Sequence, residues 1–374
     1  MKKRYHVLFA CIIAIALLFG ACQDDNQGTQ ARTATSGEVT VRLLTDATGI
    51  DDRSFNAAAW RGILEYYGDT WANQSRRGRL YEVITAQTGD MYVPNLRTAT
   101  DEGHDLIVTT GFTWADALGT VAAQNPRQNY LIVDVDWVGQ PNVMQATFAE
   151  HEGSFLVGVA AALKAIEDGI TNPRFGFIGG VPGAVITKFH VGFIQGVMAV
   201  IPDAQFVDYY TNDWGAPAMA MTQARNWYDS GIYAIFSAAG GSGNGTIAQA
   251  REYRQAGRNV WAIGVDSDQH DEGLYNATDS AVLTSMLKRV ESALVYALRA
   301  VEANNFSGRI IEFDLAMDGV GYSTTNSSAM TQSIINQVEQ YRQRIVSGQI
   351  RVIPTYAEAR SLPGFPQNLL ARDD

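Results

Sequence analysis

The sequence predicts an α/β protein with two lobes, each a mostly parallel sheet with crossover helices, joined by a hinge. From residue 38 onward, short β-branched runs alternate with helical stretches, which is the pattern of parallel strands connected by helices. The predicted strands are many for one such sheet, whereas two lobes hold them comfortably. The chain past residue 37 also shows no short-period repeat or long low-complexity segment.

The elements follow from these runs in order along the chain. The predicted strands cover residues 39–46, 79–85, 105–110, 129–135, 143–149, 174–180, 204–210, 232–237, 260–265 and 281–285. The predicted helices cover residues 54–67, 91–102, 114–124, 151–167, 185–200, 216–229, 244–256, 287–304 and 327–347. Because ligands of open α/β sheets bind outside the carboxyl ends of the strands, the loops after these strands are the places to seek function.

The N-terminus has the pattern of an export signal. Three basic residues at positions 2–4 precede an apolar run, residues 7–19, and the segment ends in Gly-Ala-Cys22. The run is too short to predict a membrane span. We therefore expect residues 1–21 to be a lipoprotein signal peptide, Cys22 to carry lipid, and the polar residues 22–37 to be a flexible tether. The alternative is an ordinary signal peptide with an incidental cysteine.

The composition excludes some classes of function. Loss of residues 1–21 would leave 25 Lys+Arg against 39 Asp+Glu, a net charge of −14. So acidic a chain argues against nucleic-acid polymers as partners, although not against uncharged nucleosides. Of the two cysteines, Cys11 lies in the predicted signal, so the mature chain would have no internal disulfide and no thiolate metal cluster. We expect a monomer with no cofactor and no bound metal.

The loop after the first predicted strand is rich in polar residues. Asp46 ends that strand and would point its carboxylate into the space between the lobes. Asp52 or Ser54 would cap the helix that follows. Phe55 beside Asn56 suits a flat heteroaromatic ligand with polar edges, although Phe55 could equally be a core contact of the first helical turn.

Later strand ends carry further candidates. Asp116 follows the third strand and is either a ligand contact or a solvated helix residue. Gly240 and Gly241 lie in a turn that lacks the Walker lysine and the dinucleotide glycine spacing, so the turn offers backbone amides to a hydroxylated ligand or is simply tight. Asp266 and Lys288 follow two other strands. They would form a structural ion pair, or the acceptor and donor of a clamp for a sugar diol.

Enzymatic signatures are absent from the sequence. There is no HExxH, no GxSxG and no CxxC motif. The run that begins at Thr45 superficially resembles the calcium-binding aspartate motif of nucleoside hydrolases. However, Leu44 stands where that motif has an aspartate, and an extra residue separates Asp46 from Gly49, so the carboxylates are misplaced for a hard cation. We therefore expect a binding protein and not an enzyme.

Seven blocks of sequence, in order, resemble the basic membrane protein family of substrate-binding lipoproteins, whose best-described branch is the purine nucleoside receptors. The blocks are TDATGIDDRSFN, TTGF, HEGSFLVGVAA, FGFIGGVPGAVITKFHVGFIQGV, AAGGSGNG, IGVDSDQ and VLTSMLKRV. The resemblance spans roughly residues 38–365. It implies a type I periplasmic-binding-protein fold with two Rossmann-like lobes, and the permease and ATPase subunits of an ABC importer as partners.

The resemblance also implies a ligand site. A purine would stack between two aromatic rings, one from each lobe, and these are Phe55 and Trp214, the latter at a position where the family usually has phenylalanine. Tryptophan stacks on a purine at least as well as phenylalanine. The other implied contacts are Asp46, Asn56 and Asp116 for the base, and Asp266, Lys288, Gly240 and Gly241 for the ribose.

These inferences combine into one expected function. The protein would be lipid-anchored in the cell envelope, facing the periplasm or exterior, and would capture guanosine, inosine or adenosine by hinge closure. A receptor for a sugar or another small polar ligand is the alternative, and a nucleoside hydrolase or an adhesin fits the residues less well. We expect lobe 1 to comprise residues 38–150 and 281–318, and lobe 2 residues 151–280 and 319–370. The hinges would lie near residues 150, 280 and 320.

Overall fold

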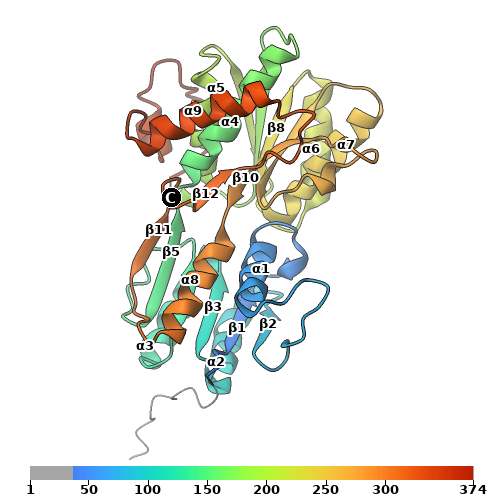
Figure 1. The fold of residues 1–374 in the computed structure, drawn as a ribbon. Coiled ribbons are helices and arrows are strands. Elements are labelled where there is room, and N and C mark those ends of the chain that lie inside the picture. The colour runs from blue at the N-terminus through green and yellow to red at the C-terminus, as the bar shows by residue number, and fades with distance from the viewer. Residues whose placement is uncertain (1–36, 374) are drawn as a thin grey trace, which may run out of the picture. The chain divides into compact units, whose positions relative to one another are not determined.

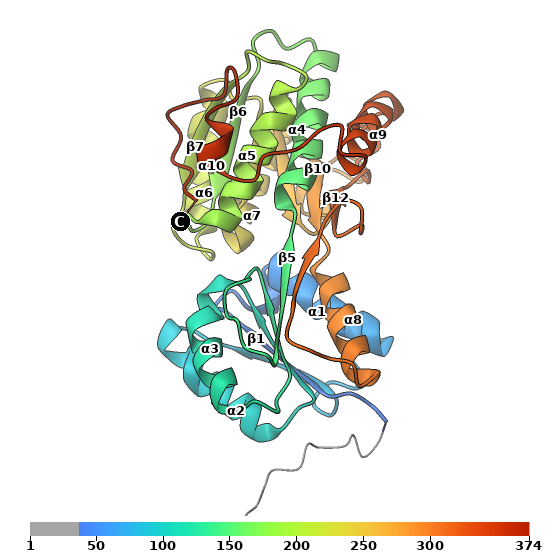
Figure 2. The same ribbon diagram turned by 90° about the vertical axis from the view of Figure 1, so that its left-hand side faces the viewer.

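The computed structural model describes residues 37–373, which lie within one compact unit. This part of the chain forms two lobes, each with a sheet covered by helices (Figures 1 and 2). The expected signal peptide, Cys22 and all of the expected tether except Gly37 lie outside the described residues.

The first lobe contains a six-stranded sheet with the order β11-β5-β4-β3-β1-β2, in which every neighbouring pair is parallel. Its strands are β1 (Val41–Thr45), β2 (Tyr81–Thr85), β3 (Leu106–Thr110), β4 (Tyr130–Val133), β5 (Val143–Phe148) and β11 (Ile310–Phe313). Its helices are α1 (Phe55–Tyr67), α2 (Tyr92–Glu102), α3 (Ala115–Gln124) and α8 (Val290–Glu302).

The second lobe repeats this architecture with the order β12-β10-β9-β8-β6-β7, in which only β12 runs antiparallel. Its strands are β6 (Arg174–Gly179), β7 (Gln205–Tyr210), β8 (Ala234–Ala238), β9 (Trp261–Asp266), β10 (Val282–Lys288) and β12 (Val320–Tyr322). Its helices are α4 (Glu150–Glu167), α5 (Ala184–Met198), α6 (Pro217–Asp229), α7 (Gly243–Gln255), α9 (Gln332–Val346) and α10 (Tyr356–Ala359).

Central strands in both sheets are apolar on both faces because helices cover both faces. Leu43 of β1 packs in a core cluster with Trp60 of α1. The next residue, Leu44, points to the opposite face and packs in a separate cluster with Leu96 of α2. This alternation along a strand buried on both sides explains the near-continuous hydrophobic runs of the sequence.

The chain passes between the lobes three times. The first crossing follows β5, where Ala149 leads into α4. The second follows β10, and the third lies between β11 and β12, in residues 314–319.

One expected boundary is wrong. Residues 282–288 were assigned to lobe 1, but they form β10, which pairs with β9 inside the second sheet. The chain returns to the first lobe only at Arg289, before α8. Lys288 therefore ends a strand and does not open a helix, because its buried strand continues through Met286 and Leu287 in the β9 ladder. This correction places Lys288 at a crossing between the lobes.

Strands β11 and β12 and helix α10 were not predicted. The two strands have only four and three residues, too few for a clear hydrophobic period. Among the helices of residues 37–373, none combines the length and the hydropathy that a membrane crossing would need.

Candidate functional site

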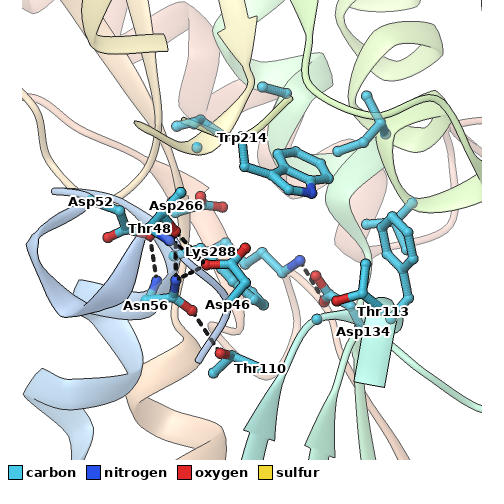
Figure 3. A pocket seen from close by; sticks show the side chains of 18 of the residues that line it. Asp46, Thr48, Asp52, Asn56, Thr110, Thr113, Asp134, Trp214, Asp266 and Lys288 are labelled. Atoms are coloured by element: carbon cyan, nitrogen blue, oxygen red, sulfur yellow. Dashed lines mark hydrogen bonds and ion pairs between the residues drawn. The ribbon is translucent and has the colours of Figure 1, made fainter. Parts of the chain in front are cut away.

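A cavity lies between the lobes at the carboxyl ends of their strands (Figure 3). The charged and aromatic residues of its lining are Asp46, Asp52, Phe55, Phe112 and Asp134 from the first lobe, and Phe189, Trp214, Asp266 and Lys288 from the second. Apolar walls with a few convergent polar groups are the usual features of a binding site.

Asp46 follows β1 directly, as predicted, and its carboxylate lies in the cavity wall. Its Oδ1 atom accepts hydrogen bonds from the backbone N–H of Thr48 at 3.1 Å and from the Thr48 hydroxyl. Asn56 donates a third hydrogen bond from Nδ2, at 3.0 Å. The turn closes because Gly49 adopts a left-handed φ of 63°, which glycine does without steric cost. Asp46 is thus held through one oxygen, leaving its other oxygen for a ligand.

Both polar atoms of the Asn56 side chain, Nδ2 and Oδ1, form hydrogen bonds in this network. Its amide donates to Asp46 and to the Thr48 hydroxyl, both at 3.0 Å. Its carbonyl oxygen accepts from the Thr110 hydroxyl of β3 at 2.6 Å. The side chain is only 2% exposed. Asn56 lines the cavity, and its amide holds Asp46 in place.

Asp52 caps helix α1, one of the two alternatives considered for this loop. Its carboxylate accepts from the backbone N–H groups of Ser54, Asn56 and Ala57 at 2.8–2.9 Å. These groups are otherwise unpaired at a helix N-terminus. Burial nevertheless raises the pKa of Asp52 to about 6, against the lowering effect of these three bonds.

Ser54 does not cap the helix with its side chain but reaches the other lobe. Its hydroxyl donates to Oδ2 of Asp266 at 2.6 Å. Asp266 ends β9 with a left-handed φ of 62°, a conformation that aspartate tolerates better than most residues. Burial raises the pKa of Asp266 to about 6, although nearby Lys288 and the Ser54 hydroxyl oppose the rise. Asp266 therefore joins the two lobes while lining the cavity.

Other hydrogen bonds tie the lobes together beside this pair. Arg61 of α1 donates to the Ser267 hydroxyl at 2.7 Å, and that hydroxyl donates to the backbone oxygen of Ser54 at 3.0 Å. Asn244 of α7 donates to the backbone oxygen of Asp52 at 3.2 Å. The described structure is thus one in which the lobes touch along one side of the cavity.

Lys288 is 1% exposed and lies among two carboxylates. Its Nζ atom is 2.5 Å from Asp134 Oδ1 and 2.8 Å from Glu150 Oε1. It also lies about 5 Å from the ring centre of Phe55, close enough for a cation–π attraction. Burial disfavours the ammonium, but Asp134, Glu150 and Asp266 outweigh this effect and raise the pKa of Lys288. The lysine therefore stays charged.

The expected ion pair of Lys288 with Asp266 is not formed. Within residues 37–373, the ion-pair partners of Lys288 are Asp134 and Glu150. Glu150 begins α4 and is also 3.3 Å from Lys188, and the two lysines hold the pKa of Glu150 down in spite of its burial. Burial dominates at Asp134 and raises its pKa, although Lys288 opposes the rise, and the nearby Glu150 carboxylate adds to it.

Two aromatic side chains from opposite lobes, Phe55 and Trp214, line the cavity. Phe55 begins α1, and Trp214 lies in the loop after β7. Phe112 of the first lobe packs against Trp214 in a T-shaped arrangement, with ring centres 6.2 Å apart and an interplanar angle of 70°. The indole of Trp214 overhangs Lys288 and the carboxylates in Figure 3.

The predicted residues do not all meet. Gly240 lines the cavity with a left-handed φ of 54°. Gly241 lies instead in an adjoining groove, which shares Asp46 and Trp214 with the cavity. Asp116 is exposed in the first turn of α3 and lines neither the cavity nor the groove. The structure therefore does not bring Asp116 together with the other predicted residues.

Sequence reasoning missed several residues of the lining. Asp134 follows β4 in the same way that Asp46 follows β1, so the rule about strand ends could have found it. Thr110 ends β3 and Thr48 lies in the loop after β1, so the same rule reaches both, whereas Phe189 carried no such signal. Phe189 lies inside α5, where an aromatic residue is more often part of the core. No group of three or more His, Cys, Asp or Glu side chains in residues 37–373 could hold a metal ion.

Comparisons with known proteins agree with this geometry. Residues 39–355 match the family described as ABC transporter substrate-binding protein PnrA-like. The chain is 39% identical to a CD4+ T-cell-stimulating antigen of Listeria innocua, over 94% of this chain and 99% of that one. It is 33% identical to the ABC transporter nucleoside-binding protein BmpA of Lactococcus lactis subsp. cremoris, with the same coverage of each chain.

A solved structure shows the same fold. A solute-binding protein of an ABC transporter system from Aeropyrum pernix K1 superposes with a TM-score of 0.73 and 25% sequence identity. The superposition covers 86% of this chain and 96% of that one. The similarity thus extends over both lobes.

Proposed function

Because the chain belongs to the PnrA-like family of ABC transporter substrate-binding proteins, and is therefore a binding protein and not an enzyme, we propose that it captures purine nucleosides between its lobes. The observation that carries the proposal is the grouping of Phe55, Trp214 and the carboxylates of Asp46 and Asp266 around one cavity. Flat aromatic walls suit a purine base, and separate carboxylates suit the donors of a base and of a ribose.

The base would bind at the Asp46 side of the cavity. Thr48 and Asn56 occupy only Oδ1 of Asp46, so Oδ2 remains to accept a hydrogen bond from an N–H group of the ligand. Phe55 and Trp214 would stack on the two faces of the ring. A carboxylate bonded in this way selects ligands with a donor edge, and guanosine and inosine have a ring N–H donor.

The ribose would bind between Asp266 and Lys288. Ser54 takes Oδ2 of Asp266, which leaves Oδ1 as an acceptor for a hydroxyl group. Lys288 has three N–H donors, and two face Asp134 and Glu150. Its third donor would serve the neighbouring hydroxyl of a diol. The two residues therefore act as acceptor and donor without pairing with each other.

The charge of the cavity favours an uncharged ligand. Its ionisable lining comprises Asp46, Asp52, Asp134 and Asp266 against Lys288 alone. Lys288 is already neutralised by two carboxylates, so the cavity offers no free cation to a phosphate group. A nucleoside satisfies these groups, whereas a nucleotide would bring its charge against the carboxylates.

Capture would proceed by closure about the three crossings. In the described structure Ser54 and Arg61 of one lobe bond to Asp266 and Ser267 of the other. A ligand that contacts both lobes stabilises such a closed state by its additional contacts. We propose that the closed form delivers the ligand to the permease and ATPase subunits of the importer, and that a lipid on Cys22 keeps the protein at the membrane.

The test is isothermal calorimetry of residues 38–374 after removal of carried-over ligand by unfolding and refolding. Guanosine, inosine, adenosine, cytidine and ribose are titrated separately. Tight 1:1 binding of purine nucleosides, with much weaker ribose binding, supports the proposal. If no nucleoside gives heat of binding and sugars or other polyols bind instead, the purine assignment is overturned, and the protein is a polyol receptor with the same fold.

A further inference from the structure

The indole of Trp214 lies directly against Gly180, the residue that follows β6. A Cβ atom added at Gly180 would be 2.1 Å from Cζ3 of the indole, 2.3 Å from Cε3 and 2.9 Å from Cη2. All three atoms belong to the six-membered ring. The absence of a side chain at Gly180 is therefore what makes room for the benzo part of the indole.

The backbone of Gly180 cannot move aside, because it is hydrogen-bonded on both sides. Its N–H donates to the Ala238 oxygen of β8 at 3.0 Å. Its carbonyl oxygen accepts from the N–H of Asn212 at 3.0 Å. A shift that relieved a clash with Trp214 would break one of these bonds next to buried strand residues, where an unmade bond is costly.

The backbone of Trp214 is equally constrained. Its carbonyl oxygen accepts from the N–H of Ser242 at 2.7 Å, and the Ser242 hydroxyl donates to the oxygen of Asp213 at 2.6 Å. Gly240 lies against the same indole, since a Cβ there would be 3.6 Å from Cε3. If Gly180 gained a side chain, the indole could only rotate into the cavity or towards Phe112.

From this packing we infer that Gly180 determines which ligands fit, although no atom of its own need touch them. It sets the depth of the indole wall, and hence the space for a base with two fused rings. A single-ring base can avoid a displaced benzo ring by sitting under the pyrrole part, whereas a purine must lie under both. This inference rests on the proposed function, because it concerns the size of the base in the same cavity.

The experiment is a double-mutant cycle with Gly180→Ala, Trp214→Phe and the double variant. Phenylalanine has no counterpart of Cη2 or of Cζ3, the atom nearest to the added Cβ, so it relieves the closest part of the clash with an alanine at position 180. Each protein is titrated with inosine, guanosine, cytidine and uridine. Gly119→Ala is the matched control, since its Cβ would meet only Val138 at 3.8 Å, an ordinary contact on α3.

Gly180→Ala should weaken inosine and guanosine binding by about tenfold or more, the usual effect of a surplus methyl group in a tight pocket. Cytidine and uridine binding should change less. In the Trp214→Phe protein, Gly180→Ala should reduce the affinity for inosine and guanosine by a smaller factor. The inference is overturned if Gly180→Ala changes purine affinity by the same factor, within about twofold, on both backgrounds, or leaves purine affinity unchanged.

A second readout separates this inference from the proposed function. In protein labelled with 5-fluorotryptophan, the ¹⁹F resonance of Trp214 is identified by its loss in Trp214→Phe. Gly180→Ala should shift that resonance in the ligand-free protein, and Gly119→Ala should not. If the wild type binds no nucleoside but the resonance shifts, the proposed function fails while the control of the indole by Gly180 stands. If Gly180→Ala leaves the Trp214 resonance unmoved, the inference that Gly180 sets the position of the indole is contradicted.

Discussion

Asn56 donates from Nδ2 to Oδ1 of Asp46 at 3.0 Å, and this bond fixes which oxygen of the carboxylate is left for a ligand. The amide itself is held by Thr110 on the neighbouring strand β3. A carboxylate oriented in advance binds a ligand at a lower entropic cost than a mobile one. The bond therefore links the packing of the first sheet to the chemistry of the cavity.

Asn56→Ala should weaken nucleoside binding by about tenfold, because Asp46 loses a donor and gains freedom to rotate. The variant should also lose about 1–3 kcal/mol of unfolding free energy, since the Thr110 hydroxyl loses its acceptor at 2.6 Å and keeps only the longer bond of 3.4 Å to the Leu44 oxygen. Calorimetry and urea denaturation measure the two effects. Asn226→Ala, at an exposed position on α6, is the control. Unchanged affinity in Asn56→Ala would contradict the positioning role.

Lys288→Met should destabilise the fold more than the same substitution at Lys164 does. It leaves Asp134 and Glu150 buried with no shared cation, and removal of one partner from a buried pair typically costs about 3–5 kcal/mol. Denaturant unfolding of the ligand-free protein gives the value. Lys164→Met is the comparison, because Lys164 also pairs with two carboxylates but these are partly exposed. Adding Asp134→Asn to Lys288→Met should restore part of the loss. Equal costs at the two lysines would refute the argument.

Nucleoside affinity should fall as the pH falls below 6. Burial raises the pKa of Asp266 to about 6, and a protonated carboxyl group is a weaker acceptor for a hydroxyl. At pH 5 only about a tenth of such a group is ionised, so affinity should be roughly tenfold lower than at pH 7.

Folding responds to pH with the opposite sign. An unfolded aspartate has a pKa of about 3.9, so between pH 4 and 6 the folded chain binds more protons than the unfolded chain. The contribution of Asp266 and Asp52 to the unfolding free energy therefore rises as the pH is lowered through 6.

Calorimetric titration of nucleoside at pH 5, 6, 7 and 8 tests the expected fall in affinity. Asp266→Asn should bind weakly with a flatter profile, and a flat wild-type profile would exclude this role for Asp266.

Arg61→Ala should speed ligand release without blocking the cavity. Arg61 joins the lobes by donating to Ser267 at 2.7 Å, and a hydrogen bond to a charged group contributes about 1.5–3 kcal/mol. Its loss from the closed state should raise the dissociation rate by about tenfold. Stopped-flow fluorescence measures the rate. Arg225→Ala is the control because Arg225 contacts Gln249 and Glu252 within one lobe. If both variants release ligand at the wild-type rate, this contact does not stabilise closure.

Cys22→Ser should release the full-length protein from the membrane fraction, because the proposed lipid is its only expected anchor. Labelling of cells with an alkyne-bearing fatty acid should mark the wild type and not the variant. Ser36→Ala, in the same polar segment, is the control and should stay labelled. Persistent labelling of Cys22→Ser would show that the lipid is attached elsewhere or that the segment is processed differently.

The alternation of strands and helices was predictable from the sequence, and so was the end of the sheets at which the cavity lies. Periodicity identifies a run such as Leu43-Leu44 as a strand covered on both faces, because each residue has a helix to pack against. The rule that ligands bind at the carboxyl ends of strands selected Asp46 and Asp266, and both line the cavity.

Only the tertiary structure decided how these residues pair. The local pattern after Met286 does not reveal whether the chain continues as a strand, and the β9 ladder is what keeps Lys288 in the second sheet. Partners that are distant in sequence then decide which contacts it makes. Asp134 and Glu150 form ion pairs with Lys288, and Ser54 donates a hydrogen bond to Asp266. Asp116 shows the same limit, since its place on the exposed turn of α3 depends on how that helix packs. The sequence by itself therefore determined the fold class and which strand ends line the cavity. The packing of the two sheets determined which side chains meet, because contacts between distant segments leave no periodic signal in the chain.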